Sequence, residues 1–141
     1  MATNEQIKTI TDHYLLALLW TMPGDDENEN PGDSLSIHCD LGEGVREQAE
    51  SDVRAFVEKC GLLFDQTMAC FDDGYGQHPD AGSAEAAFGQ DFALTRNGHG
   101  VGFWDREDQG LPNEMGEALT ELCDPGECNL YVGDDGKAYF D

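Results

Sequence analysis

Four side chains that could do acid–base chemistry lie within one short stretch of the chain, residues 91–106. They are Asp91, Arg96, His99 and Asp105. A histidine can serve as a general base, an arginine can hold an anion, and carboxylates can orient both groups. No nucleophile-bearing elbow, phosphate-binding loop or metal-ligand spacing accompanies them in the sequence. We therefore expect no catalytic residue: Arg96 and Asp105 would brace strand ends, and His99 would lie exposed at a turn.

Two aromatic residues in the same stretch, Phe103 and Trp104, offer a different kind of site. If they lie on a strand, their side chains point to opposite faces. One then enters the core, and the other either packs under a helix or is presented to a partner. Arg96, His99, Trp104 and Asp105 are therefore candidate residues of this motif. A small hydrolase or ligand-binding domain that uses them requires a concave pocket beside His99, with Arg96 pointing into it.

Carboxylates are the most abundant chemically active groups, because the chain has 30 acidic residues against 7 basic ones. A predicted helix over residues 43–60 carries five of them on its outer face: Glu43, Glu47, Glu50, Asp52 and Glu58. Helix residues three or four apart lie about 5–6 Å from one another, a spacing comparable to that of phosphates along one nucleic-acid strand. The alternative is a solvated helix face with ordinary ion pairs, such as Glu50 with Arg54.

An acidic loop is predicted between the first two helices, from Pro23 to Leu41. Its carboxylates include Asp25, Asp26, Glu27 and Glu29. The loop resembles a calcium loop in composition, but it lacks the glycine at the sixth position and the acidic residue at the twelfth. We therefore expect no site of the EF-hand kind. The loop and the acidic helix face together form the predicted partner-binding surface.

Cysteines could provide metal or redox chemistry. The chain has five of them: Cys39, Cys60, Cys70, Cys123 and Cys128. An odd number at irregular spacing argues against a disulfide framework and predicts reduced thiols. Cys123 and Cys128 could complete a zinc site with His38 and Cys39, but no Cys-x-x-Cys spacing anchors such a site. Ordinary buried thiols are the alternative. We expect no metal and no cofactor.

Helices dominate the part of the chain before these candidate residues. Thr3 and Gln6 form a capping box, and apolar residues at three-to-four spacing then predict a helix that ends at Met22-Pro23-Gly24. The second helix spans residues 43–60, and a short third helix or continuation follows over 62–71. Residues 72–89, rich in glycine and alanine, are predicted to form a mobile loop.

The last third of the chain is predicted to contain strands. The expected order is a β-hairpin (91–96 and 101–105, with turn formers at 97–100), a helix (111–123) and a second hairpin (130–133 and 137–140). The predicted fold class is therefore α+β. Residues 1–141 would form one acidic domain in which two or three N-terminal helices pack on one antiparallel sheet of about four strands.

One long motif carries a resemblance to a known family. It reads DFALTRNGHGVGFWDR from Asp91 to Arg106 and is followed by YVGDDGKAY from Tyr131 to Tyr139. With a helix that ends in Leu-Leu-Trp before an acidic loop, the chain resembles a family of small acidic bacteriophage proteins. The resemblance covers most of the chain and implies a viral origin, without an established activity. Residues 72–89 depart from it, because they are longer and richer in glycine than expected.

The formal net charge of −23 bears most directly on function. Such a chain repels nucleic acid and attracts proteins that bind nucleic acid. Our first hypothesis is a phage inhibitor that mimics nucleic acid and occupies the DNA- or RNA-binding groove of a host defence or nucleic-acid-processing protein. It would be of the anti-restriction or anti-CRISPR type. The second is a small accessory phage protein whose acidity serves solubility. Adaptation to high salt ranks below the first hypothesis.

Location and partners follow from the same composition. The longest apolar run is about a third of the roughly 20 residues that a membrane span requires, and the first residues lack the features of a signal peptide. We expect the host cytoplasm, a monomer or homodimer, and a host nucleic-acid-binding protein as partner, without direct contact with nucleic acid or membrane. Mimicry predicts carboxylates clustered along an elongated ridge, whereas solubility predicts an even spread.

Overall fold

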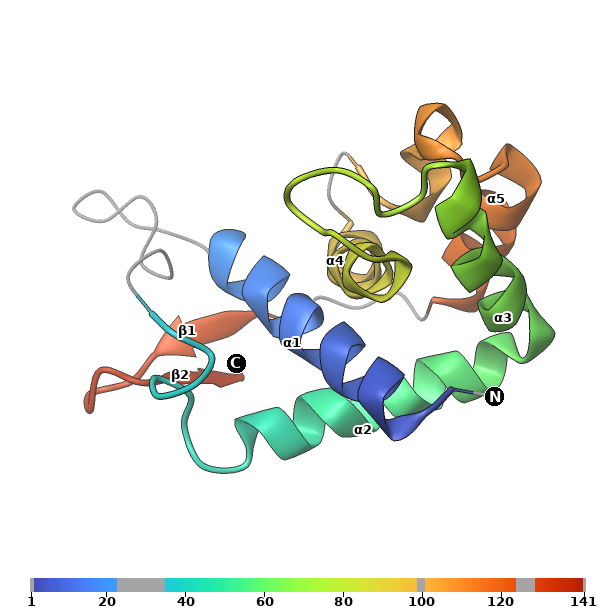
Figure 1. The fold of residues 1–141 in the computed structure, drawn as a ribbon. Coiled ribbons are helices and arrows are strands. Elements are labelled where there is room, and N and C mark those ends of the chain that lie inside the picture. Colours follow the sequence, from blue (N-terminus) through green and yellow to red (C-terminus); the bar gives the residue numbers. More distant parts are fainter. Residues whose placement is uncertain (1, 23–34, 99–100, 124–128, 141) are drawn as a thin grey trace.

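The structure is a computed structural model that describes residues 2–22, 35–98, 101–123 and 129–140 (Figure 1). Over these residues the chain is mostly helical, with five α-helices, three short 3-10 segments and one two-stranded hairpin. The α-helices are α1 (Asn4–Trp20), α2 (Val45–Cys60), α3 (Leu62–Ala69), α4 (Ala84–Arg96) and α5 (Asn113–Leu122). The 3-10 segments are η1 (Cys70–Asp73), η2 (Phe103–Asp105) and η3 (Glu107–Gln109), and the strands are β1 (Leu130–Val132) and β2 (Ala138–Phe140).

The predicted α+β fold with a sheet of about four strands is wrong. Residues 91–96, predicted as a strand, form the second half of α4, and residues 101–105 contain the 3-10 segment η2. The last six residues of the predicted loop over 72–89 are not a loop, because they form the first half of α4. This helix begins after Ser83, whose hydroxyl accepts a hydrogen bond from the Ala86 amide at 3.1 Å. In the described part of the chain the sheet is confined to β1 and β2.

Helix α4 has no apolar stripe, because it is buried on every side. Residues 86–93 are all buried, and they include Gln90 and Asp91 as well as alanine, glycine and phenylalanine. A helix surrounded by neighbours does not show the three-to-four periodicity of a surface helix. The dipeptide Asn97-Gly98, predicted as part of a hairpin turn, instead closes the helix, since Gly98 adopts a φ of +69° and glycine favours the position just after a helix.

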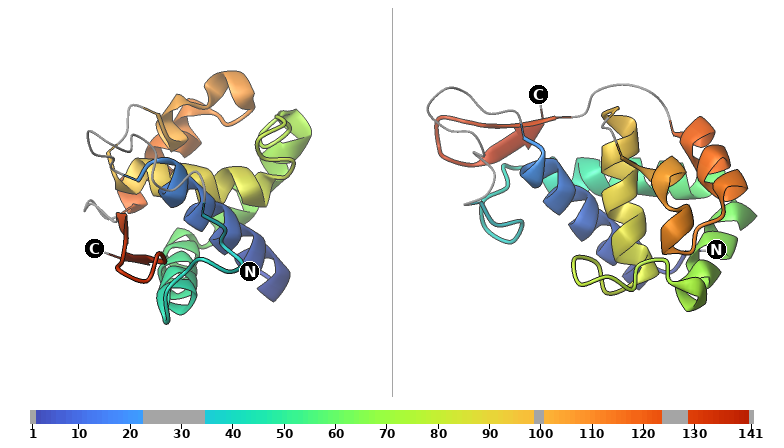
Figure 2. Two further views of the ribbon diagram at one scale, coloured as in Figure 1. Left: turned by 90° about the vertical axis from the view of Figure 1, so that its left-hand side faces the viewer. Right: turned by 90° about the horizontal axis from the view of Figure 1, so that it is seen from above.

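The central position of α4 depends on a close approach to α1. Figure 2 shows α4 between α1 on one side and the segment from η2 to α5 on the other, and α4 contacts both α1 and η2. A β-carbon at Gly89 would overlap the backbone carbonyl of Ile10 on α1. Glycine at this position therefore allows the two helices to cross in contact.

Aromatic rings join the helices in the core. The rings of Phe56 on α2 and Phe92 on α4 stack with their centroids 4.4 Å apart. Phe88 on α4 meets Phe64 on α3 edge to face at 5.3 Å, and Phe103 on η2 lies 5.2 Å from Phe88. These pairs connect four segments of the chain by contacts that stabilise beyond their buried area.

The other helices and the C-terminal hairpin confirm the prediction. Thr3 and Gln6 form the capping box of α1, and the observed bounds of α2 and α5 lie within two residues of the predicted ones. Strands β1 and β2 pair antiparallel, with Tyr131 opposite Tyr139, and Ala138 also bridges to Leu41. No helix within the described ranges is long and apolar enough to cross a membrane.

Candidate functional site

The acidic face of α2 is the first predicted site. Three of its carboxylate residues are exposed, as is Glu43 two residues before the helix, and we call these four the α2 stripe: Glu43, Glu47, Glu50 and Glu58. Gly44, with a φ of +84°, precedes the first residue of the helix and turns the chain into it. Arg54 lies on the same face, and its Nε is 3.6 Å from the Glu50 carboxylate. The stripe is therefore an accessible acidic helix face with one internal ion pair.

Asp52, the fifth predicted residue of this face, is not part of the exposed stripe. Its carboxylate is 20 % exposed and lies 3.1 Å from Nη1 of Arg96 on α4, while Gln48 donates to its other oxygen at 3.0 Å. Arg96 also donates to the hydroxyl of Tyr14 on α1 at 2.9 Å. Asp52 therefore connects α2 with α4 and α1, and its charge is used inside the protein.

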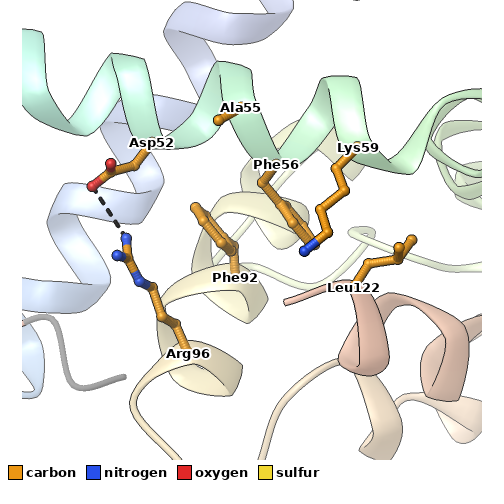
Figure 3. Close-up of a pocket in the computed structure, with 7 residues that line it drawn as sticks. All are labelled: Asp52, Ala55, Phe56, Lys59, Phe92, Arg96 and Leu122. Atoms are coloured by element: carbon orange, nitrogen blue, oxygen red, sulfur yellow. Dashed lines mark hydrogen bonds and ion pairs between the residues drawn. The ribbon is translucent and has the colours of Figure 1, made fainter. Parts of the chain in front are cut away.

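A small pocket of about 140 Å³ lies beside this ion pair (Figure 3). It is lined by seven residues from α2, α4 and α5: Asp52, Ala55, Phe56, Lys59, Phe92, Arg96 and Leu122. Figure 3 shows the stacked rings of Phe56 and Phe92 between the Asp52–Arg96 pair and the Lys59 side chain. The pocket thus combines an apolar floor with the cationic side chains of Lys59 and Arg96 and with the carboxylate that Arg96 contacts.

This pocket partly meets the requirement of the ligand-binding hypothesis, because Arg96 lines it. Its seven lining residues include no histidine, cysteine, serine or threonine that could act as base or nucleophile, and the Asp52 carboxylate is held by Arg96. A space of this size is below the roughly 300 Å³ at which ordinary ligand pockets begin. His99 lies outside the described residues, so its predicted role stays a prediction.

A buried polar cluster surrounds Asp91, the remaining acid of the motif. One oxygen of Asp91 accepts a hydrogen bond from the Tyr75 hydroxyl at 2.7 Å. The other accepts from Nε of Arg106 at 2.9 Å and lies 2.8 Å from its Nη2. Burial raises the pKa of Asp91, although the bonds from Arg106 and Tyr75 act in the opposite direction. The same burial, together with the neighbouring carboxylate, raises the pKa of Tyr75 well above its ordinary value.

This cluster has the composition of an acid–base site but the geometry of a structural one. Asp91 is 2 % exposed and Tyr75 is fully buried, so no substrate reaches them in this conformation. Both carboxylate oxygens are occupied by donors of the protein. The cluster therefore holds the segment before α4 and the segment after η2 against the centre of the fold.

Trp104 and Asp105 are exposed on η2, whereas the neighbouring Phe103 is buried. The expectation that one ring of the pair enters the core and the other does not is met, although by a 3-10 turn and not by the alternation of a strand. Arg96 on α4, by contrast, points toward Asp52 on α2 (Figure 3). The predicted pairing of Arg96 with Asp105 as a brace of strand ends is therefore wrong.

A second acidic surface surrounds α5, and we call it the α5 acidic surface. It comprises eight exposed residues on η1, η2, η3 and α5: Asp72, Asp73, Asp105, Glu107, Asp108, Glu114, Glu117 and Glu121. These segments pack together: Sγ of Cys70 contacts Sδ of Met115, and a β-carbon at Gly110 would overlap the carbonyl of Asp73. Figures 1 and 2 place them at the end of the molecule away from the hairpin.

Sequence reasoning missed the α5 acidic surface because it considered only the inward side of this helix. The signal was present: Glu114, Glu117 and Glu121 follow three-to-four spacing, and they alternate with the buried positions Gly116 and Leu119. The contribution of η1 and η3 could not be read from spacing, because these segments approach α5 only in the folded chain.

The arginines of the chain are all engaged with its own carboxylates. Among the described residues Arg46 lies 2.6 Å from Asp12, Arg54 lies 3.6 Å from Glu50, Arg96 lies 3.1 Å from Asp52 and Arg106 lies 2.8 Å from Asp91. The segments η1, η2, η3 and α5 contain no lysine or arginine, and Arg106, which lies between η2 and η3, is paired with the buried Asp91. The Arg106 side chain is only 17 % exposed, so its positive charge is directed toward Asp91 in the interior.

The remaining predicted residues fall partly outside the described chain. Asp25, Asp26, Glu27 and Glu29 of the acidic loop lie there, as does Cys128. Cys39 is an exposed free thiol, Cys60 and Cys70 are buried free thiols, and Cys123 is buried. Within the described ranges no three histidine, cysteine, aspartate or glutamate residues are placed to hold a metal ion. The suggested zinc set is not tested as a whole, because Cys128 belongs to it.

Comparisons of the chain with protein-family models, with curated proteins and with solved structures find no match.

Proposed function

We propose that this chain is a phage-encoded inhibitor that acts in the host cytoplasm by imitating the charge of nucleic acid. It occupies the DNA- or RNA-binding groove of a host defence or nucleic-acid-processing protein. The observation that carries the proposal is the α5 acidic surface, where eight exposed carboxylates gather on segments that contain no lysine or arginine, and where the neighbouring Arg106 is engaged by Asp91. Carboxylates that are not neutralised within the protein are available to lysines and arginines of a target.

The charge density of this surface is sufficient for a short stretch of duplex. B-DNA carries one phosphate charge per roughly 1.7 Å of axis, so eight carboxylates correspond to about 14 Å of duplex. Glu114 and Glu121 are seven residues apart, which places them about 10 Å apart along α5. The carboxylates of this surface can thus take the place of phosphates in contacts with a few cationic side chains of a target. Such binding is fast at low salt and weakens steeply as salt is added.

A second candidate function, an accessory phage protein whose acidity serves solubility, is favoured by another observation. Exposed carboxylates also occur away from α2 and α5, on α1, α3, the segment before α4 and the hairpin turn: Glu5, Asp65, Asp80 and Asp134. A protein that needs only solubility distributes its charge in this way. The two functions differ in whether the position of a carboxylate matters or only the total charge.

The test uses three variants that change the net charge by the same amount. The first replaces Glu114, Glu117 and Glu121 by glutamine, and the second replaces Glu43, Glu47 and Glu58 by glutamine. The third, as control, carries Glu5→Gln, Asp80→Asn and Asp134→Asn at exposed positions elsewhere. The wild-type protein, immobilised, captures targets from host lysate at low salt. Each captured protein is then tested for release by duplex DNA and for binding of the variants.

Nucleic-acid mimicry predicts that DNA releases the captured protein and that at least one of the first two variants binds it much more weakly than the control does. Removing three contacts of about 1 kcal/mol each lowers the affinity roughly hundredfold. If all three variants behave alike, or if nothing basic is captured, the proposed nucleic-acid mimicry is wrong and the accessory function stands.

A further inference from the structure

A groove lies at the corner between α2 and α3, where Glu58 at the end of the α2 stripe forms part of its lining. Its volume is about 720 Å³, within the range of ligand-binding clefts. The apolar part of its lining comes from Ile7 on α1, Val57 on α2, and Leu62 and Phe64 on α3. Figure 1 shows the N-terminal end of α1 beside this corner. Three segments that are distant in sequence therefore build one apolar surface.

Leu62 makes this surface accessible. Its side chain is 78 % exposed, whereas Ile7 and Phe64 at the base of the groove are almost fully buried. The exposure follows from the local chain: Gly61, with a φ of +57°, ends α2 and begins α3, so that Leu62 stands at the corner. A single exposed leucine is ordinary, but one at the rim of an apolar groove extends a surface that a partner can cover.

Charge around the groove selects its occupant. Glu58 and Asp65 lie among its lining residues. Arg54, also in the lining, is held by Glu50 and by the side-chain oxygen of Asn4 at 3.2 Å, so its charge is offset in place. A second copy of this chain would bring another net charge of −23 to an acidic rim, which electrostatic repulsion opposes.

We propose that this groove binds an amphipathic segment of the target protein in which large apolar side chains are flanked by lysine or arginine. The apolar side chains enter the groove beside Leu62, and the cations meet Glu58 and Asp65. The groove shares α2 with the α2 stripe, since Val57 lines the groove and Glu47 and Glu50 continue along the helix. The inference rests on the proposed function for one point, that the partner is basic. Beyond that function, it adds an apolar contact at Leu62 whose strength does not depend on salt.

The experiment measures binding of fluorescent peptides by anisotropy. One peptide of about 16 residues, long enough to form a helix, carries leucines at three-to-four spacing and lysines elsewhere. A second has the same composition with the leucines dispersed around the helix. Leu62→Ser removes the exposed apolar side chain, and Val132→Ser removes a half-exposed apolar side chain on β1 as the matched control. Circular dichroism checks that both variants fold.

The expected result is that the patterned peptide binds better than the dispersed one, and that Leu62→Ser weakens it about tenfold while Val132→Ser does not. This loss persists when salt is raised from about 0.05 to about 0.5 M, because apolar burial is not screened. Equal binding of the two peptides, or equal affinity of wild type and Leu62→Ser, would overturn the proposal. So would sedimentation that shows a wild-type dimer which Leu62→Ser dissociates.

The outcomes also separate this inference from the proposed function. If the patterned peptide binds through Leu62 but the captured protein is not released by DNA, the groove is a peptide-binding surface and mimicry is wrong. If DNA releases the target while Leu62→Ser changes nothing, mimicry stands and the groove proposal is wrong.

Discussion

Helices α2 and α4 carry the same carboxylate chemistry in opposite surroundings. On α2, Glu47 and Glu58 face solvent and the helix has one clear apolar side. On α4, Asp91 is 2 % exposed and is enclosed by Tyr75 and Arg106. The surroundings thus decide what a carboxylate does. The buried one is tied to the stability of the fold, and the exposed ones add to mutual repulsion and remain available to a partner.

Because α4 is buried and the carboxylates of α2 and α5 are exposed, substitutions in these helices should affect different measurements. Substitutions on α4 should change the free energy of unfolding strongly, because they alter packing or leave a buried charge without its partner. Substitutions on α2 and α5 should change binding while leaving the fold nearly as stable.

The largest effect is expected for Asp91→Asn. The amide has nearly the shape of the carboxylate but lacks its charge, so the partly buried Arg106 loses its counter-ion. Breaking a buried pair in this way lowers the free energy of unfolding by about 3–5 kcal/mol. Urea denaturation followed by tryptophan fluorescence measures it. Glu117→Gln on the exposed face of α5 is the control and should change stability by less than about 0.5 kcal/mol. An Asp91→Asn midpoint equal to that of wild type contradicts the structural role of the cluster.

Gly89→Ala should have the next largest effect. The added methyl group meets the backbone carbonyl of Ile10, which cannot move away as a flexible side chain could. The helices α1 and α4 must separate, and overpacking of this kind destabilises by about 1–3 kcal/mol. Ser51→Ala on the exposed face of α2 is the matched control, and it should change stability by only a few tenths of a kcal/mol. If Gly89→Ala is as stable as wild type, the two helices do not cross in contact as described.

The same contrast explains which parts of the fold could be predicted. Helices α1, α2 and α5 each have a buried side and an exposed side, so their periodicity is visible in the sequence. Helix α4 has no exposed side over residues 86–93, and its alanines and glycine resemble a loop. The N-cap Ser83 was the local signal for this helix, and the Asn97-Gly98 pair fits a helix end as well as a hairpin turn.

The candidate site was predictable to the extent that it lies on one helix. The exposed glutamates of α2 follow from three-to-four spacing alone. Asp52 falls outside this spacing, because it follows Glu50 by only two residues, but its partner Arg96 could not be predicted, since that residue comes from a helix that was assigned as a strand. The α5 acidic surface and the groove beside Leu62 depend on segments brought together by the fold, for which a single sequence provides no pairing signal.

Alkaline pH should lower the free energy of unfolding through a buried thiol of the interior. Burial raises the pKa of Cys60 from 9.0 to about 12. Above pH 9 the unfolded chain therefore releases this proton while the folded chain retains it, so the free energy of unfolding falls as the pH rises toward 12. The slope is at most about 1.4 kcal/mol per pH unit, reduced by the solvent that reaches the thiol. Cys60→Ala should flatten the decline of the urea midpoint between about pH 8 and pH 10.5, and Cys39→Ala, at an exposed thiol, should not. Equal slopes in both variants contradict the assignment.

The smallest effect has the opposite sign and belongs to the surface. Replacing Glu114, Glu117 and Glu121 by glutamine removes like charges three and four residues apart on α5, so stability should rise by a few tenths of a kcal/mol. Added salt screens the same repulsion, and the gain should therefore disappear near 1 M sodium chloride, where the Debye length is about 3 Å.

Glu50→Gln provides the contrast, because it removes the carboxylate that Arg54 contacts and should slightly lower stability at low salt. Urea midpoints at low and high salt measure both effects. If the triple variant is less stable than wild type at low salt, these glutamates hold the fold together, and the division between a stabilising interior charge and a repelling surface charge does not extend to α5.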